Sequence, residues 1–277
     1  QGMVCHESYR DIEGNWLYPD EVEKIDEKNY KKKIDGTKVT VGPPESMSKS
    51  KKNTIDPEIM ISQYGADAVR WFIMSDSPPE KDIQWSNVGV AAANKFLQKI
   101  WNLISSISKE NKEITDKVYE SEFTKKVNTF MHKIDISINQ FRFNVSIALF
   151  YELFNYFIKN KTSKVSQGVI KKCLIDVMKL MIPFTPHLAR ESLELLNNKT
   201  PNQWPYIDTE KLTNEINFAV QVNGKTRDII ILTKDTEEKE INSIDDLLDD
   251  DLLAGLSDDD EGLFDFKHTP KETSMPE

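Results

Sequence analysis

The stretch MSKSKKNTIDPEIMISQYGADAVRWFIMSDSPP, residues 47–79, decides how the chain is organised. Two prolines precede it, and it begins with alternating serines and lysines before apolar residues take over. Asp56 followed by Pro57 is a strong helix start, with Asp56 at the N-cap and Pro57 in the first turn. The prolines before the stretch disfavour helix at the residues that precede them. The sequence therefore predicts an exposed serine–lysine loop, residues 46–53, between two fixed points.

The residues after the serine–lysine loop predict two short helices. The apolar pattern breaks after Tyr64, where Gly65 can adopt the left-handed conformation that ends many helices. Either Ser62 or Asp67 could cap the chain at this break, and the sequence leaves the choice open. Arg70 is expected to form a salt bridge with Asp67 or with another neighbour. The segment thus leads as a helix–break–helix unit into the next region.

From Ser86 to about Asn197 the apolar residues follow a helical period. Two predicted helices carry apolar faces formed by Leu97, Ile100, Trp101, Ile104 and Ile107, and by Ile170, Leu174, Val177, Met178 and Met181. A third, FNVSIALFYELFNYFIK, could be capped by Asn144. Pro183 ends one helix and Thr185-Pro186 begins another. Four or five helices with short polar links are typical of a helical bundle, whose aromatic residues we interpret as core.

After NQWPY the pattern alternates, as in strands. Asn223-Gly224 separates the strand-like runs FAVQV and KTRDIIIL, which predicts a β-hairpin with a type I′ turn. Alternation would place Lys225 and Arg227 on one face of the second strand. Residues 243–277 interleave acidic residues with Leu and Phe, a composition that predicts disorder because it cannot bury enough apolar surface.

The net charge of −10 belongs to the end of the chain. Residues 243–277 contain 12 Asp and Glu and 2 Lys, whereas the remaining residues contain 34 basic and 34 acidic side chains. A body without net charge can still bind a polyanion through local basic patches. The acidic total therefore does not exclude a nucleic-acid partner.

The cysteines favour a reducing compartment for the protein, and the cysteines and histidines together indicate no metal site. Cys5 and Cys173 lack the spacing of metal ligands, and the four histidines are scattered along the chain. Both cysteines are interpreted as packing or surface residues. No apolar run approaches the ~18 residues of a membrane span, and no basic-then-apolar segment opens the sequence.

The serine–lysine loop has chemistry that suits phosphate. Ser48, Lys49 and Ser50 offer one ammonium group and two hydroxyls to phosphate oxygens. In nucleotidyl transfer, negative charge develops on the leaving pyrophosphate, and a mobile lysine–serine loop can close on it and neutralise it. The same few residues also fit an exposed basic linker or a phosphorylation site, and from the short motif alone that interpretation is favoured.

The wider context reverses this preference. Residues 47–79 resemble the signature loop of class I aminoacyl-tRNA synthetases and the segment after it. The spacing of SKSKKN, DP, YGAD, VR and SPP is similar to that of bacterial-type leucyl-tRNA synthetases. QGMV resembles a strand that enters the active site, FNVSIALFYELFN and PFTPHLA resemble helices of the anticodon-binding bundle, and QVNGKTR resembles the start of the small C-terminal domain. The resemblance covers residues 1 to about 242.

The resemblance implies roles for individual residues. Lys49 would be catalytic. The ATP-binding residues would be those of the first half of the loop: Met47, Ser48, Lys49 and Ser50. The candidate tRNA contacts are basic residues of the loop and the hairpin: Lys51, Lys52, Lys225 and Arg227. We expect Asn53 and Asp56 to shape the loop and cap the helix. Ser46 stands where the family has the first lysine of its signature, and we expect this change to weaken ATP handling.

The implied fold is mainly α. Its expected parts are the end of a nucleotide-binding α/β domain in 1–85, a helical tRNA-binding bundle in 86–210, the start of a small, truncated C-terminal α/β domain with its hairpin in 211–242, and a disordered acidic tail in 243–277.

The implied function is that of the C-terminal portion of a leucine–tRNA ligase. Such an enzyme activates leucine with ATP, accompanied by Mg²⁺, and transfers it to tRNA(Leu). We expect neither a membrane nor a DNA partner, a cytoplasmic or organellar location, and no aminoacylation by this chain alone, because the upstream half of the active site is missing from it. The partner of the tail stays open. Alternatives are an isoleucyl-, valyl- or methionyl-type synthetase, or a non-catalytic RNA-binding or scaffold protein that contains a synthetase fragment.

Overall fold

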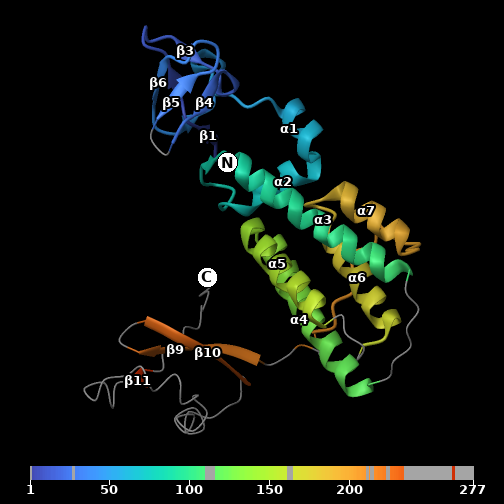
Figure 1. Ribbon diagram of the computed structural model, residues 1–277. Coiled ribbons are helices and arrows are strands. Elements are labelled where there is room, and N and C mark those ends of the chain that lie inside the picture. The colour runs from blue at the N-terminus through green and yellow to red at the C-terminus, as the bar shows by residue number, and fades with distance from the viewer. Residues whose placement is uncertain are drawn as a thin grey trace, which may run out of the picture. The chain divides into compact units, whose positions relative to one another are not determined.

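The structure is a computed structural model that forms two compact units, Gln1–Leu212 and Thr213–Glu277 (Figure 1). It describes residues 2–26, 29–109, 116–160, 165–209, 212, 215–222, 225–233 and 264–265. The first unit contains the serine–lysine loop and every helix of the described residues. Its fold confirms the prediction of a mainly α chain with a helical bundle.

A five-stranded antiparallel sheet begins the first unit. Its order is β3-β2-β6-β5-β4. The strands are β2 (Tyr9–Arg10), β3 (Trp16–Leu17), β4 (Val22–Lys24), β5 (Tyr30–Lys32) and β6 (Lys38–Val41), with a 3-10 helix η1 (Pro19–Glu21) between β3 and β4. Tyr9, Leu17, Val22 and Val39 form its small separate core. Short strands thus hold this sheet together with few buried side chains.

A second small sheet positions the serine–lysine loop. β1 (Val4–His6) lies between β7 (Glu45–Ser46), which is antiparallel to it, and β8 (Ile83–Gln84), which is parallel. The predicted entering strand therefore begins later than QGMV, because only Val4 of that segment belongs to β1. The chain leaves this sheet at β7, passes through the loop and two helices, and returns to it at β8.

The helix–break–helix prediction is confirmed by α1 (Pro57–Tyr64) and α2 (Ala66–Ser75). Asp56 caps α1 as expected, because its side chain accepts a hydrogen bond from the backbone N–H of Glu58 at 2.8 Å. Gly65 separates the helices with φ 82° and ψ 152°, so its φ is positive as predicted but its ψ is extended. Such a backbone conformation favours glycine, which has no Cβ.

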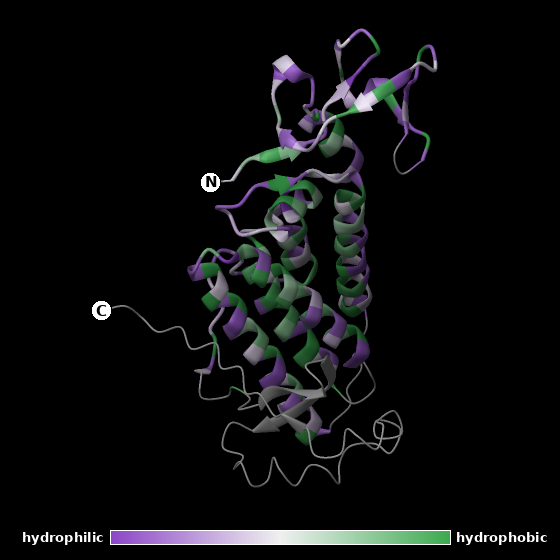
Figure 2. Ribbon diagram, turned by 90° about the vertical axis from the view of Figure 1, so that its left-hand side faces the viewer, coloured by the Kyte–Doolittle hydropathy of each residue, from purple (hydrophilic) through white to green (hydrophobic). Residues whose placement is uncertain are grey.

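The bundle consists of α3 (Asn87–Lys109), α4 (Lys117–Asn139), α5 (Phe143–Asn160), α6 (Gln167–Met181) and α7 (Pro186–Leu195). Figure 2 shows hydrophobic and hydrophilic residues interleaved along these helices. The two predicted apolar faces are buried, except that Trp101 is partly exposed. The predicted cap of α5 is wrong: the helix already begins at Phe143, so Asn144 lies inside its first turn.

The bundle core continues into the helices that follow the loop. Trp71 of α2 is fully buried, and its ring lies 6.0 Å from that of Phe150 and 6.3 Å from that of Phe184. Its Nε1 donates a hydrogen bond to the Tyr151 hydroxyl at 3.1 Å. Helix α2 is therefore part of the same packed body as the bundle.

The salt bridge expected for Arg70 is wrong, and of the two caps left open at the break, Asp67 is not one. Arg70 forms no salt bridge with Asp67 among the described residues; it donates to the carbonyl oxygens of Pro183 and Phe184. Asp67 accepts a hydrogen bond from the backbone N–H of Leu188, at the start of α7, so it does not cap its own helix. Both side chains bind partners more than 110 residues away in the sequence. Local sequence patterns do not reveal such contacts.

The two cysteines, Cys5 and Cys173, are free and buried, so of the two interpretations, packing or surface, the structure supports packing. Within the described residues, no helix combines the length and the apolar character needed to cross a membrane.

The second unit contains the predicted hairpin. β9 (Glu215–Val222) pairs antiparallel with β10 (Lys225–Thr233), and β11 (Phe264–Asp265) pairs with the other edge of β9. The Asn223-Gly224 turn lies outside the described residues. The register shifts between Thr226 and Asp228, where Arg227 stands, so the strict alternation assumed for Lys225 and Arg227 is interrupted. The predicted tail, apart from β11, also lies outside the described residues.

Candidate functional site

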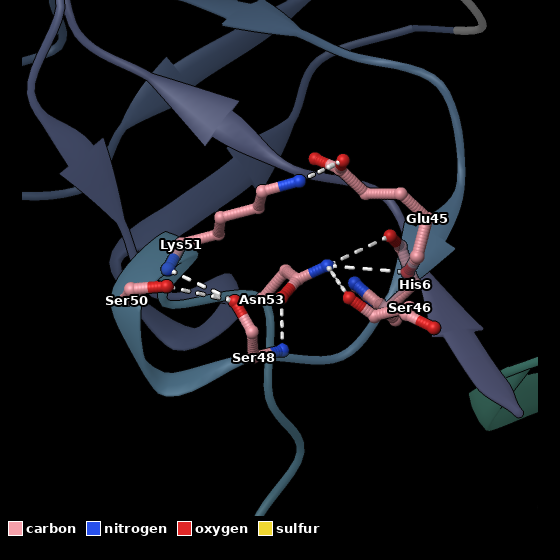
Figure 3. Close-up of polar contacts among 7 residues, drawn as sticks. All are labelled: His6, Glu45, Ser46, Ser48, Ser50, Lys51 and Asn53. Carbon is pink, nitrogen blue, oxygen red and sulfur yellow. Dashed lines mark hydrogen bonds and ion pairs between the residues drawn. The ribbon is translucent and has the colours of Figure 1, made fainter.

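The serine–lysine loop folds into one turn of 3-10 helix, η2 (Lys49–Lys51). Ser48 is its N-cap: the Ser48 Oγ accepts a hydrogen bond from the backbone N–H of Lys51 at 3.3 Å and lies 3.1 Å from the Ser50 Oγ (Figure 3). Lys52 ends the turn with φ 52°, a left-handed conformation. The two serines that we predicted to bind phosphate therefore have their hydroxyls side by side.

Asn53 fixes the base of the loop. It is fully buried, and its Oδ1 accepts a hydrogen bond from the backbone N–H of Ser48 at 2.8 Å. Its Nδ2 lies 3.3 Å from each of the carbonyl oxygens of His6, Glu45 and Ser46, and so ties the loop to β1 and β7 (Figure 3). A buried amide left without partners is costly, so these contacts hold the base of the loop in one place. The prediction that Asn53 shapes the loop is confirmed.

The lysines of the loop differ in their surroundings. Lys51 forms an ion pair with Glu45, in which its ammonium donates a hydrogen bond to the Glu45 carboxylate (Figure 3). This hydrogen bond is the main cause of the lowered pKa of Glu45. The Lys52 ammonium lies over the ring of Tyr18, 5.1 Å from its centre, in cation–π geometry. The Lys49 side chain is exposed and makes no polar contact with the described residues, although the Lys49 carbonyl accepts a hydrogen bond from the backbone N–H of Lys52 at 3.3 Å. Of these lysines, Lys49 is the one whose side chain has no partner among the described residues.

The other predicted residues of the loop have structural positions as well. Met47 is half-buried: its side chain packs against the main core and its backbone N–H donates to the Val4 carbonyl at 3.1 Å. Ser46 lies in β7 opposite Cys5 and is exposed. Met47 therefore anchors the loop, while Ser46 faces solvent just before it.

Sequence reasoning missed Glu45 and Tyr18. Glu45 is close in sequence to its partner Lys51, so an acid just before a basic loop was an available signal. Tyr18 comes from the turn after β3 and contacts Lys52 across 34 positions, and no local pattern marks it.

The bundle carries a cavity of about 570 Å³ between α4, α6 and the segment at 203–208. Lys179 is buried in its wall, and its ammonium lies 3.7 Å from the Asp176 carboxylate. Burial raises the pKa of Asp176, and burial also raises the pKa of the Cys173 thiol to about 12.

In the part of the chain that the structure describes, no group of three His, Cys, Asp or Glu residues could hold a metal ion.

The architecture of loop, helix pair and bundle corresponds to two family models. Residues 22–86 match "tRNA synthetases class I (I, L, M and V)", and residues 120–242 match "Anticodon-binding domain of tRNA ligase". The chain belongs to the class I tRNA synthetase family.

Within this family, the chain is similar in sequence to several leucine–tRNA ligases. The leucine–tRNA ligase of Zymomonas mobilis is 37% identical over 248 residues, which cover 88% of this chain and 28% of that protein. The leucine–tRNA ligase of Parvibaculum lavamentivorans is 37% identical over 256 residues, 87% of this chain and 29% of that protein. The chain thus spans less than a third of the length of these relatives.

A solved structure shows the same fold. It is LeuRS of Agrobacterium radiobacter K84, in a ternary complex with tRNA and LeuAMS. The similarity has a TM-score of 0.59 at 24% identity and covers 74% of this chain and 28% of that one. The similarity therefore shows a shared fold over about three quarters of this chain.

Proposed function

We propose that the chain is the part of a leucine–tRNA ligase that brings the serine–lysine loop to ATP and a helical bundle to tRNA(Leu). The observation that carries this proposal is the contrast among the loop lysines. Lys51 and Lys52 have protein partners, whereas Lys49 has none among the described residues and stands on a loop that buried Asn53 holds in place. The leucine–tRNA ligase relatives support the choice of reaction.

In the first step, a carboxylate oxygen of leucine bonds to the α-phosphorus of ATP, and the bond from that phosphorus to the bridging oxygen breaks. Pyrophosphate leaves with the negative charge. The Lys49 ammonium neutralises this charge, and the hydroxyls of Ser48 and Ser50 donate hydrogen bonds to phosphate oxygens. Mg²⁺ arrives with the triphosphate as part of the substrate. Positioning and electrostatics suffice, and no covalent protein intermediate is required.

In the second step, a hydroxyl oxygen of the terminal ribose of tRNA(Leu) bonds to the leucyl carbonyl carbon, and the bond from that carbon to the phosphate oxygen of the adenylate breaks. AMP leaves with the negative charge, and the hydroxyl proton passes to solvent. The bundle binds the tRNA backbone by shape and charge. We assign further tRNA contacts outside the bundle, to Lys51 and Lys52 of the loop and to Lys225 and Arg227 of the hairpin. The chain alone contributes only this part of the active site, so we expect it to bind tRNA without charging it. Such an enzyme works in the cytoplasm or in an organelle.

The test uses a hybrid ligase, in which this chain replaces the matching segment of the Zymomonas mobilis relative. We expect the hybrid ligase to exchange pyrophosphate with ATP in the presence of leucine and to charge tRNA(Leu). Its unfolding curve serves as the control for correct folding. A folded hybrid ligase that neither exchanges pyrophosphate nor charges tRNA would overturn the proposal.

A further inference from the structure

Residues 182–185 connect α6 to α7 and are called the corner below. Helix α2 contacts the corner and the start of α7 through Asp67 and Arg70, two opposite charges about one helical turn apart. The Asp67 carboxylate accepts hydrogen bonds from the backbone N–H of Leu188 at 2.7 Å and of His187 at 3.4 Å, and it lies 2.9 Å from the His187 Nδ1. The Arg70 guanidinium donates to the carbonyl oxygens of Phe184 at 3.1 Å and Pro183 at 2.6 Å. A single turn of one helix thus binds both the corner and the start of α7.

These charges match the needs of the two helix ends. The first amides of a helix and the last carbonyls of a helix lack partners within that helix. A carboxylate is favoured at a helix N-terminus and a cation at a C-terminus. Thr185, at the N-cap of α7, makes no side-chain hydrogen bond to the helix. Asp67 therefore caps the N-terminus of α7, and Arg70 adds a cation at carbonyls two and three residues beyond the end of α6, whose own last turn contains Lys179.

The contacts join the two modules that the family models separate. Asp67 and Arg70 lie in the class I synthetase match, residues 22–86, whereas the corner lies in the anticodon-binding match, residues 120–242. On the first side, α2 follows directly on α1 and the serine–lysine loop. Met47 of the loop packs against the same core that contains Trp71 of α2. A continuous chain of packed and hydrogen-bonded groups therefore runs from the loop to the corner.

We propose that Asp67 and Arg70 form a clamp that couples tRNA binding on the bundle to the position of the serine–lysine loop. This inference rests on the proposed function, because it requires the bundle to bind tRNA. Both residues are positioning residues: they act on the loop through α1 and α2. Packed side chains and hydrogen-bond networks of this kind carry coupling between distant sites. Coupling is demonstrated when events at both sites shift the conformational equilibrium of the same structural element.

The test follows the loop while tRNA binds. Cys5 and Cys173 are buried, so a Ser50→Cys chain can be labelled with a thiol-reactive fluorophore at the exposed loop position. tRNA(Leu) is titrated, its binding is followed by anisotropy of labelled tRNA, and the loop is followed by the emission of the fluorophore. We expect a saturable emission change, and we expect Asp67→Asn with Arg70→Gln to reduce its amplitude at least twofold while tRNA still binds.

Two further variants separate coupling from folding. Arg190 also lies on α7 and is exposed, and its side chain donates to the Asn202 side chain at 3.1 Å instead of contacting Asp67 or Arg70, so Arg190→Gln should leave the emission change intact. Arg70→Lys alone keeps a cation beside the corner carbonyls and should give an intermediate amplitude, even if the double variant does not fold.

The outcomes distinguish the clamp from the proposed function. Failure of the unsubstituted chain to bind tRNA would contradict the proposed function. Binding without any emission change, or an equal change in the clamp variants, would overturn the clamp.

Discussion

The helical bundle and the serine–lysine loop belong to the same folded unit but are held by different interactions. In the bundle, Phe150, Phe154 and Phe157 are almost completely buried, and the rings of Phe154 and Phe157 lie 6.1 Å apart. In the loop, Lys49 and Ser50 are exposed, and one buried amide, that of Asn53, ties the segment to its neighbours. Hydrophobic burial is non-directional, whereas the loop depends on a few directed hydrogen bonds.

This difference shows how the chain keeps reactive groups accessible. A loop packed by apolar side chains would cover its own lysine, whereas a polar tie at the base leaves the tip open to solvent. The loop can therefore be altered without loss of the fold, and the bundle cannot. Substitutions in each region make this comparison quantitative.

The largest effect on stability is expected in the bundle. Phe150 is fully buried, and its ring lies 5.5 Å from that of Phe184. Phe150→Ala removes this ring and leaves a cavity, which should lower the free energy of unfolding by about 3–5 kcal/mol. Chemical denaturation measures the change. Tyr206→Ala is the control, because this aromatic residue is exposed and its loss should cost no more than about 0.5 kcal/mol. Equal costs for the two variants would contradict the account.

A smaller loss of stability is expected at the base of the loop. Asn53→Ala leaves the Ser48 amide and the carbonyls around it without their partner, at a cost of about 1–3 kcal/mol. Denaturation should place this variant between Phe150→Ala and an exposed amide change. Asn202→Ala removes an exposed amide that accepts from Arg190 and serves as the matched control. If Asn53→Ala costs no more than Asn202→Ala, the amide does not hold the loop.

The smallest effect concerns pH and the bundle thiol. Burial raises the pKa of Cys173 from its ordinary value of 9.0 to about 12. The folded state therefore keeps the thiol protonated, and this contribution to stability is complete below pH 9.0 and is lost as pH rises through about 12. At pH 8, alkylation of Cys173 in a Cys5→Ala chain should be far slower than in the urea-unfolded chain. Equal rates would show that the thiol is neither buried nor shifted.

Features that depend on neighbouring residues could be predicted from the sequence. Asp56-Pro57 and Thr185-Pro186 mark the starts of α1 and α7, because helix starts are set by local backbone geometry. The helical period located the bundle, and the serine–lysine pattern located the loop. The cap of α5 was misplaced at Asn144, since helix ends shift readily by a residue or two.

Features that depend on distant residues could not be predicted. Asp67 and Arg70 have their partners on the start of α7 and on the corner, and Lys52 has its partner on Tyr18. No periodicity marks such pairs. The irregularity at Arg227 likewise depends on how two strands pair rather than on either strand alone.

The central claim is that Lys49 supplies the charge for catalysis while its neighbours hold the loop. The most direct test is leucine-dependent pyrophosphate exchange by the hybrid ligase with Lys49→Ala or Lys51→Ala. Loss of one preorganised charge contact should lower the rate by about 10²–10³ in Lys49→Ala, with tRNA binding nearly unchanged. Lys51→Ala should cause a much smaller loss, because that lysine is already paired with Glu45. Near-normal exchange in the Lys49→Ala enzyme, or equal losses in both, would contradict the account.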